Sequence, residues 1–362
     1  MKSRKTLNRI AAAVLAAVLL IPAQVFAVGG SSSESPGVTF DESLYRTVIN
    51  RSIKAKKIKN VELRTMIKEN SDGYAVVQGG CTDGKYAYYL MVSSYTQNGR
   101  ILKVNIRNNK VVGRSKILNT WHGNGMTYDS KRKQLVVIAR EHRKQEITVV
   151  DARTLKITRQ EDVKYDYYEF AGKDSLTRTH QRQGLAAIAY VKRYDCYVAL
   201  ERTYNNLLFF DPDTFEAVGI AYTDILRDYP GTFQAMDADD KYVYLLLSYY
   251  NKGGRVQPNN LILALDWNSE NMLPVVNGEL ICVPEAWSCN NDGSGKPDAV
   301  IRIKSKHEAE NIYHTTDKTG SEHFYMSEYY GRYAYKKVRV NGKKKKQIYY
   351  KRSGYVYDLG II

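Results

Sequence analysis

Long apolar segments are almost absent from this sequence. The one uninterrupted apolar run, 10–20, is too short for a membrane-spanning helix, which needs roughly 20 residues. It follows a basic, acid-free start, Met1–Arg9, and is followed by small residues within Val25–Ala27. This order is typical of a signal peptide. We therefore predict a signal peptide over 1–27, cleavage near Ala27, a secreted extracellular protein, and no stable membrane insertion after cleavage.

Cysteine is scarce as well. The four cysteines form no CxxC pair and no Cys/His zinc spacing, so neither a metal site nor a cofactor is expected. No cysteine directly follows the apolar run, so a lipoprotein anchor is not expected either. Export permits disulfides. Only Cys282 and Cys289 are close in sequence, so a bridge between them is one alternative and free thiols are the other. Cys81 and Cys196 fall in expected strands, where buried thiols are equally compatible with the pattern.

Acidic residues are missing from one segment of a chain whose formal net charge is +16. Ten lysines and arginines lie between Arg332 and Arg352 without any Asp or Glu. In an exported protein, such a cluster indicates an anionic partner, such as a cell-wall polymer, an anionic glycan or lipid headgroups, rather than nucleic acid. The alternative is a hairpin that lysines merely keep soluble. The residues proposed for this anion-binding patch are Lys343, Lys344, Lys345 and Lys346.

Helical periodicity is also missing outside the signal, whereas the 30 tyrosines favour strands. A unit recurs four times: a strand of small residues, then two apolar strands, the second of which ends in Asp or Asn. The end markers, Asn105, Asp151, Asp211 and Asp266, are 46, 60 and 55 residues apart. Four strands in about 40–50 residues, once insertions are discounted, is the pattern of a β-propeller blade. An all-β propeller is therefore the predicted fold class.

The blade count rests on the last third of the chain. Leu273–Val283 is expected to be the outer strand of the fourth blade. A degenerate fifth blade is expected to use the strands Ala309–Tyr313, Glu322–Tyr329 and Tyr333–Val340, with Asn341-Gly342 as a hairpin turn. Lys57–Met66 is a candidate for its missing outer strand, which would close the ring. Five blades fit best, and six would be required if 355–362 or 282–300 formed a further blade.

The segment Val149–Lys156, which reads Val-Val-Asp-Ala-Arg-Thr-Leu-Lys, resembles the YVTN/NHL-type propeller repeats of bacterial surface and secreted proteins. The resemblance extends from Gln78 to about Val283 and concerns architecture. It implies a fold that binding proteins, lactonases, glycosidases and lyases share, so it does not imply an activity.

Equivalent positions of the inner strands carry mostly polar side chains. Alignment on the turns places Gln78, Asn124, Ala186, Gln234 and Glu310 at one level of the central channel. Amides both donate and accept hydrogen bonds, which suits a sugar. We therefore predict ligand-binding roles for Gln78, Asn124, Gln234 and Glu310, together with His122 two residues before Asn124. The alternative is a channel that holds only water.

These observations favour a non-catalytic, monomeric propeller that binds a carbohydrate or an anionic cell-envelope polymer. A leader over 28–56 precedes one domain, 57–362, which includes the basic hairpin 332–352. One alternative is a hydrolase of the glycosidase, lyase or lactonase type that uses His122, Asp237 and Glu310. The third blade offers only alanines where such chemistry would place a carboxylate. A protein-interaction scaffold is the other alternative.

Overall fold

The computed structural model describes residues 51–54, 56–62, 75–93, 97–120, 122–123, 125–139, 147–162, 185–201, 207–221, 232–249, 259–266, 281–283, 299–304, 308–316, 319–340 and 342–361. All of them belong to one unit, Thr39–Ile362. Strands dominate this part of the chain, and a 3-10 turn, Lys192–Tyr194, joins two of them. Among the residues described, no helix is long and apolar enough to cross a membrane.

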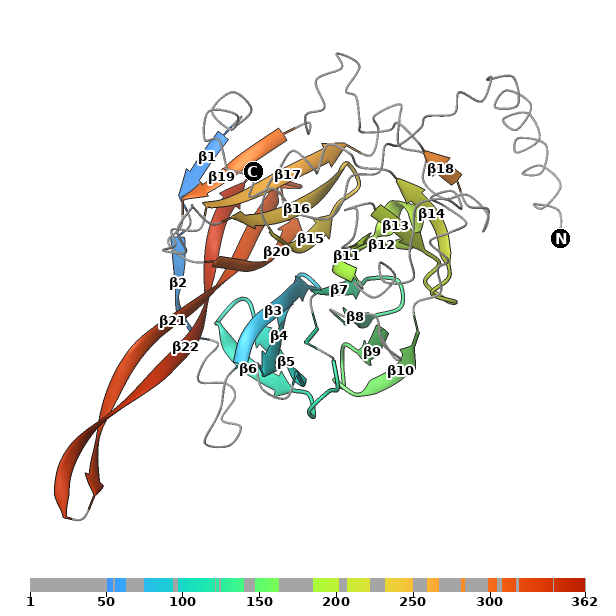
Figure 1. Cartoon of the computed structure of the whole chain (residues 1–362). Coiled ribbons are helices and arrows are strands. Elements are labelled where there is room, and N and C mark those ends of the chain that lie inside the picture. The colour runs from blue at the N-terminus through green and yellow to red at the C-terminus, as the bar shows by residue number, and fades with distance from the viewer. Residues whose placement is uncertain are drawn as a thin grey trace, which may run out of the picture. The chain divides into compact units, whose positions relative to one another are not determined.

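The strands form five sheets, which we call blades 1 to 5 (Figure 1). Blade 1 contains β3 (Ala75–Thr82), β4 (Tyr86–Ser93), β5 (Gly99–Asn105) and β6 (Lys110–Arg114). Blade 2 contains β7 (Gly125–Asp129), β8 (Gln134–Ile138), β9 (Ile147–Asp151) and β10 (Ile157–Glu161). Blade 3 contains β11 (Leu185–Val191), β12 (Cys196–Glu201), β13 (Leu207–Phe210), β14 (Ala217–Ala221) and β18 (Ile281–Val283).

The last two blades combine strands from both ends of the chain. Blade 4 contains β15 (Thr232–Ala238), β16 (Tyr242–Tyr249), β17 (Asn259–Asp266), β19 (Ala299–Lys304) and β1 (Arg51–Lys54). Blade 5 contains β20 (Glu308–Thr316), β21 (Glu322–Val340), β22 (Lys343–Ile361) and β2 (Lys56–Glu62). Strand β2 runs antiparallel to β22, so the N-terminal part of the chain supplies the outer strand of the last blade.

The five blades form a closed ring. The first strand of each blade contacts the first strand of the next, and β20 of blade 5 contacts β3 of blade 1. The buried apolar side chains fall into five clusters, one between each pair of neighbouring blades. The cluster between blades 5 and 1 joins Val77 and Tyr89 to Tyr313 and Val356, which are far apart in sequence. The predicted five-bladed propeller is thus confirmed.

Packing of the blades explains which strands are apolar on both faces. Strand β12 is buried at all six positions, and β4 is buried at every position except its two ends, because both faces of a blade meet a neighbour. The outer strands β6 and β10 have no buried residue, and even their apolar side chains Val112 and Ile157 are exposed. The apolar runs that marked the second strands in the sequence therefore reflect two-sided burial.

One turn design recurs where the first strand of a blade leads into the second. Asp83 Oδ1 accepts hydrogen bonds from the backbone N–H groups of Lys85 and Tyr86. Asp129 and Asp239 accept two backbone N–H groups at the same spacing. This is Asx-turn chemistry, in which a side-chain oxygen bonds the backbone that follows it. These carboxylates therefore form the turns, and we call this end of the first strands the turn end.

Two adjacent glycines show how closely the first strands approach one another. A Cβ atom on Gly79 would lie 3.0 Å from the backbone nitrogen of Met126 in blade 2. A Cβ atom on Gly80 would lie 1.7 Å from Asn311 Nδ2 in blade 5. Asn311 is buried, and its Oδ1 accepts a hydrogen bond from the backbone N–H of Ser327. Blade 1 can therefore contact both neighbours only because these two positions carry no side chain.

Two predicted strands are wrong. The described part of the expected outer strand Leu273–Val283 is β18, which pairs with β14 of blade 3, whereas β19 is the fourth strand of blade 4. Tyr333–Val340 is not a third strand of blade 5, because it continues β21. The third strand is the C-terminal half of β22, and Gly342, with φ of +76°, lies at the distal turn. The described C-terminal strands complete blades 3 to 5, and the described residues form five blades.

The cysteines divide between described and undescribed parts of the chain. Cys81 and Cys196 are buried free thiols, and burial raises the pKa of both. The backbone of Cys282 lies in β18, whereas Cys289 lies outside the described residues. The Cys282–Cys289 disulfide therefore stays a prediction.

Candidate functional site

The first strands carry a β-bulge at the register position that the sequence singled out. The ladder with the second strand shifts at Gln78 in β3, at Ala186 in β11, at Gln234 in β15 and at Glu310 in β20. Asn124, the fifth predicted member, directly precedes β7 and lies outside the described residues. A bulge redirects a side chain locally, so the repeat preserves a position where residues turn out of the ladder. We call this end of the first strands the bulge end.

At the bulge end, amides and carboxylates of neighbouring blades pair with one another. Gln78 Nε2 of blade 1 donates to Glu310 Oε2 of blade 5 at 3.1 Å, and both side chains are buried. Gln234 Nε2 of blade 4 donates to Glu308 Oε1 of blade 5 at 2.6 Å. The structure therefore brings Gln78 and Glu310 together, as the alignment implied. The hydrogen bond of Gln78 with Glu310 joins blade 5 to blade 1, and the hydrogen bond of Gln234 with Glu308 joins blade 5 to blade 4.

His122 lies in the connection between blades 1 and 2. Its backbone N–H donates to the carbonyl oxygen of Gln97, and its Nδ1 lies 2.5 Å from Gln97 Oε1. Its φ of +78° is uncommon for a residue other than glycine, and the two contacts with Gln97 hold it there. His122 is thus a fixed member of the loops at the bulge end, while a ligand-binding role for it remains a prediction.

Asp237 lies at the opposite end of the channel from Glu310. Its Oδ2 accepts hydrogen bonds from the backbone N–H of His314, at 2.7 Å, and from His314 Nδ1, at 2.6 Å. Glu310 and His314 are four residues apart on β20, which corresponds to about 13 Å along a strand. The structure therefore does not bring Asp237 and Glu310 together, and the three-residue centre considered for a hydrolase does not form.

The sequence did not single out His314, whose pKa is strongly raised in the folded protein. Its Nε2 lies 3.3 Å from Glu322 Oε2, so each ring nitrogen faces a carboxylate. Burial disfavours its charged form, but the negative charge and hydrogen bond of Asp237 outweigh this and raise the pKa to about 9. At neutral pH the ring is therefore protonated and has no lone pair with which to accept a proton. The geometry indicates an ionic latch between blades 4 and 5.

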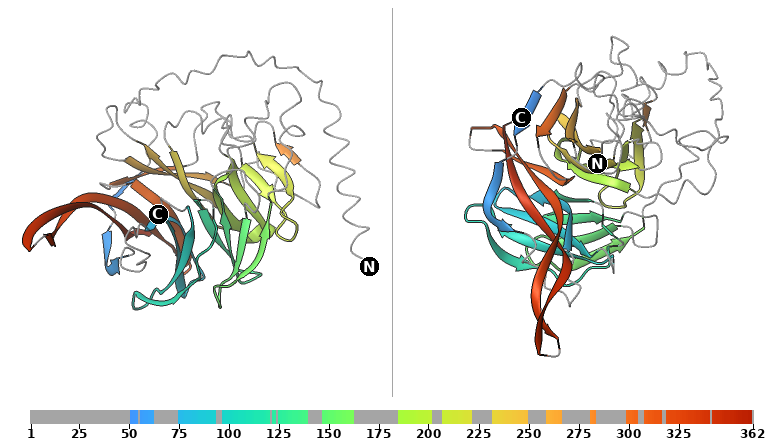
Figure 2. Two further views of the ribbon diagram at one scale, coloured as in Figure 1. Left: turned by 60° about the horizontal axis from the view of Figure 1, so that its bottom comes forward. Right: turned by 60° about the vertical axis from the view of Figure 1, so that its left-hand side comes forward.

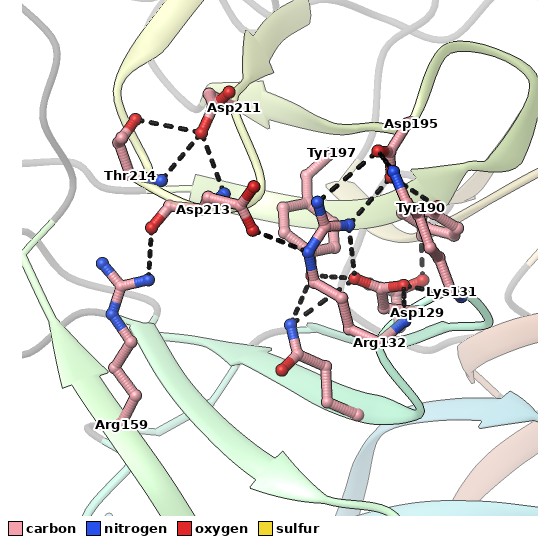
Figure 3. Close-up of polar contacts among 12 residues, drawn as sticks. Asp129, Lys131, Arg132, Arg159, Tyr190, Asp195, Tyr197, Asp211, Asp213 and Thr214 are labelled. Carbon is pink, nitrogen blue, oxygen red and sulfur yellow. Dashed lines mark hydrogen bonds and ion pairs between the residues drawn. The ribbon is translucent and has the colours of Figure 1, made fainter.

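A second ionic cluster joins blades 2 and 3 at the turn end (Figure 3). Arg132, in the turn after β7, contacts Asp129 Oδ2 at 3.2 Å, Asp195 Oδ1 at 2.8 Å and Asp213 Oδ1 at 2.8 Å. Tyr197 OH of blade 3 donates to the fully buried carboxylate of Asp129 at 2.7 Å. The cluster is satisfied by its own members, so we assign it to blade docking.

The longest hairpin of the protein extends from blade 5. Strand β20 pairs with β21 as far as Tyr329, and β2 pairs with β22 from Tyr355 onward. Beyond these points β21 and β22 pair with each other up to Val340 and Lys343, and they project from the rest of the described chain (Figures 1 and 2). We call the segments 332–340 and 342–352 the arm. In the described chain, neither strand of the arm has a second partner strand.

The side chains described at the tip of the arm are mostly exposed cations. They are Lys337, Arg339, Lys343, Lys344, Lys345 and Lys346. The strand register places Lys337 directly opposite Lys346, and Arg339 directly opposite Lys344. Like charges that face each other across a ladder destabilise it. The tip therefore keeps two repulsive cation pairs in a segment that contains no acidic residue.

Comparison with known proteins identifies no family. No family model matches the chain, and no curated protein sequence matches it significantly, so the resemblance to YVTN/NHL repeats stays a prediction. Three of the solved structures that match are distant in sequence. They are glutaminyl cyclase of Myxococcus xanthus (12% identity, TM-score 0.46, 86% of this chain and 99% of that chain), a luciferin-regenerating enzyme (10%, 0.38, 85% and 96%) and hydrazine synthase of Kuenenia stuttgartiensis (13%, 0.36, 75% and 59%). Function therefore has to be inferred from the geometry of the chain itself.

Among the described residues, no group of three or more His, Cys, Asp or Glu side chains could hold a metal ion.

Proposed function

We propose that this protein is a secreted binding propeller that attaches to an anionic polymer of the cell envelope through the tip of its arm. The proposal rests on two places where exposed cations lie directly opposite each other: Lys337 opposite Lys346, and Arg339 opposite Lys344. A polyanion would neutralise both pairs at once, so the free energy of the repulsion favours binding. The ring of blades supports the arm by fixing its base in blade 5.

The bulge end is a weaker candidate for the binding surface. Two predicted ligand-binding groups, Gln78 and Glu310, are buried and hydrogen-bonded to each other. A sugar at this level would have to replace that contact with its own hydroxyl groups. The six tip cations of the arm are exposed, so a polyanion reaches them without entering a buried contact.

The test is salt-dependent binding of the purified protein to an anionic wall polymer. Replacing Lys343, Lys344, Lys345 and Lys346 with Gln is expected to weaken binding and to flatten its dependence on salt, since counterion release falls with each lost contact. The matched control removes the same charge elsewhere, through glutamine substitutions at four exposed lysines: Lys110, Lys116, Lys156 and Lys192. Equal binding by both variants would show that the arm is not the attachment site.

A further inference from the structure

The directly opposed cations at the tip of the arm all lie on one of its two faces. Side chains alternate along a strand, and directly opposed residues share a face. The register therefore places four cations on one face, Lys337, Arg339, Lys344 and Lys346. At the tip, the opposite face has Lys343 opposite Val340 and Lys345 opposite Val338. Nearer the base of the arm, the register places Lys336 on that face, opposite Gln347, and Arg332 opposite Lys351. We call the first set the four-cation face.

The spacing of this face is set by the backbone. Lys337 and Arg339 are two residues apart on β21, and Lys344 and Lys346 are two residues apart on β22, so each pair is spaced by about 6.8 Å. Across the ladder, opposed side chains begin about 5 Å apart. The face thus presents two parallel rows of positive charge with a repeat close to 7 Å.

A flexible polyanion matches this repeat when six single bonds separate its charges. Six backbone bonds separate equivalent atoms two residues apart in a strand, which span about 7 Å when extended. A phosphodiester polymer with a three-carbon spacer also has six bonds from one phosphorus to the next. A phosphodiester keeps its negative charge throughout the physiological pH range, and lysine binds phosphate as a compact point charge.

We propose that the four-cation face binds an extended phosphodiester polymer of this kind, with successive phosphates between its two rows. This inference rests on the proposed function and adds to it the face of the arm and the chemistry of the polymer. Each phosphate lies between one cation of β21 and the opposed cation of β22, where it offsets the repulsion of that pair. At the tip, the other face has no opposed cations, because valines are opposite Lys343 and Lys345, and it takes no part.

The experiment compares two variants that lose the same charge from adjacent positions. Lys344→Gln/Lys346→Gln removes two of the four cations of the four-cation face. Lys343→Gln/Lys345→Gln removes the two tip lysines of the other face. The probe is poly(glycerol phosphate), titrated into the purified full protein at several salt concentrations. One phosphate at each of the two opposed pairs gives a slope of log K against log salt of about −1.4, at about 0.7 per neutralised phosphate for a flexible strand.

The expected result is weaker binding and a flatter slope for Lys344→Gln/Lys346→Gln, because each phosphate keeps only one of its two cations. Binding and slope close to the wild-type values are expected for Lys343→Gln/Lys345→Gln. Equal losses in both variants would overturn the assignment to one face and leave the proposed function standing. If neither variant changes the slope, the proposed function fails too. Poly-L-glutamate is the competitor: binding as tight as that of poly(glycerol phosphate), with the same dependence on the two variants, would overturn the phosphodiester assignment. Both variants are expected to keep the wild-type unfolding midpoint within error, because the four replaced lysines are exposed.

Discussion

The stability of the seam between blades 2 and 3 is predicted to depend on a single arginine. Replacing Arg132 with Ala removes the partner of Asp129, whose carboxylate is fully buried, and also the contacts with Asp195 and Asp213. Loss of one partner from a buried ion pair costs about 3–5 kcal/mol, because the remaining charge is left uncompensated. Contacts with exposed carboxylates contribute little.

The other contacts of Asp129 narrow this range of destabilisation. Asp129 keeps hydrogen bonds from two backbone N–H groups and from Tyr197 OH when Arg132 is absent, which favours the lower limit of about 3 kcal/mol. The side chain of Asp213 is 74% exposed, so Asp213→Asn should cost less than about 1 kcal/mol. At no more than about 2 °C per kcal/mol for a domain of this size, Arg132→Ala should lower the unfolding midpoint by up to about 6 °C.

The assay is equilibrium unfolding in urea, followed by far-ultraviolet circular dichroism and by fluorescence, whose coincidence is needed for a two-state treatment. Arg107→Ala, at an exposed turn position, is the control for loss of one positive charge. The double variant Arg132→Ala/Asp129→Asn should recover part of the loss, because it removes the uncompensated charge. The reasoning is refuted if Arg132→Ala matches Arg107→Ala, or if Asp213→Asn costs as much as Arg132→Ala.

Two further predictions concern the seams of blade 5. His314, which faces Asp237 and Glu322 with Asp239 nearby, has a pKa of about 9 in the folded protein, against an ordinary value of 6.5 for histidine. Its stabilisation is therefore complete below pH 6.5 and is lost as pH rises through 9. Stability should fall by about 2 kcal/mol between pH 6.5 and 8.5, and a flat profile in urea titrations of the wild type, or an unchanged decline in His314→Gln, would contradict the latch. Gly80→Ala should cost about 1–3 kcal/mol, because the new Cβ meets Asn311 Nδ2. Asn311→Ala in the same chain should remove part of that cost, and strict additivity in the double-mutant cycle would argue against the clash.

Local chemistry explains which parts of the fold were predictable. Asp83, Asp129 and Asp239 bond backbone groups two and three residues ahead, so the sequence around each of them is enough to define the turn. The bulge position was recognised because these turns set the register of the first strands. Two-sided burial gave the second strands their apolar runs. These features repeat in the chain, and the repeat revealed them.

The errors concern pairings that depend on long-range packing. Nothing within 273–304 distinguishes a strand that joins β14 from one that joins β17, because the choice depends on which blade edge is open. The long hairpin misled in another way: Asn341-Gly342 marked a true turn, but β21 extends past blade 5 before reaching it. His314 was overlooked because its partners, Asp237 and Glu322, lie in other strands.

Two explanations of the arm make different use of the same lysines. Lysine on an exposed edge strand prevents pairing with other chains, and that role requires charge but is indifferent to the face that bears it. It gives no reason to place Arg339 opposite Lys344 and Lys337 opposite Lys346, since opposed cations weaken the hairpin that they protect. Binding of a polyanion does give a reason, because each opposed pair becomes a site for one anionic group. The arrangement of the cations therefore favours recognition over solubility as the role of the arm.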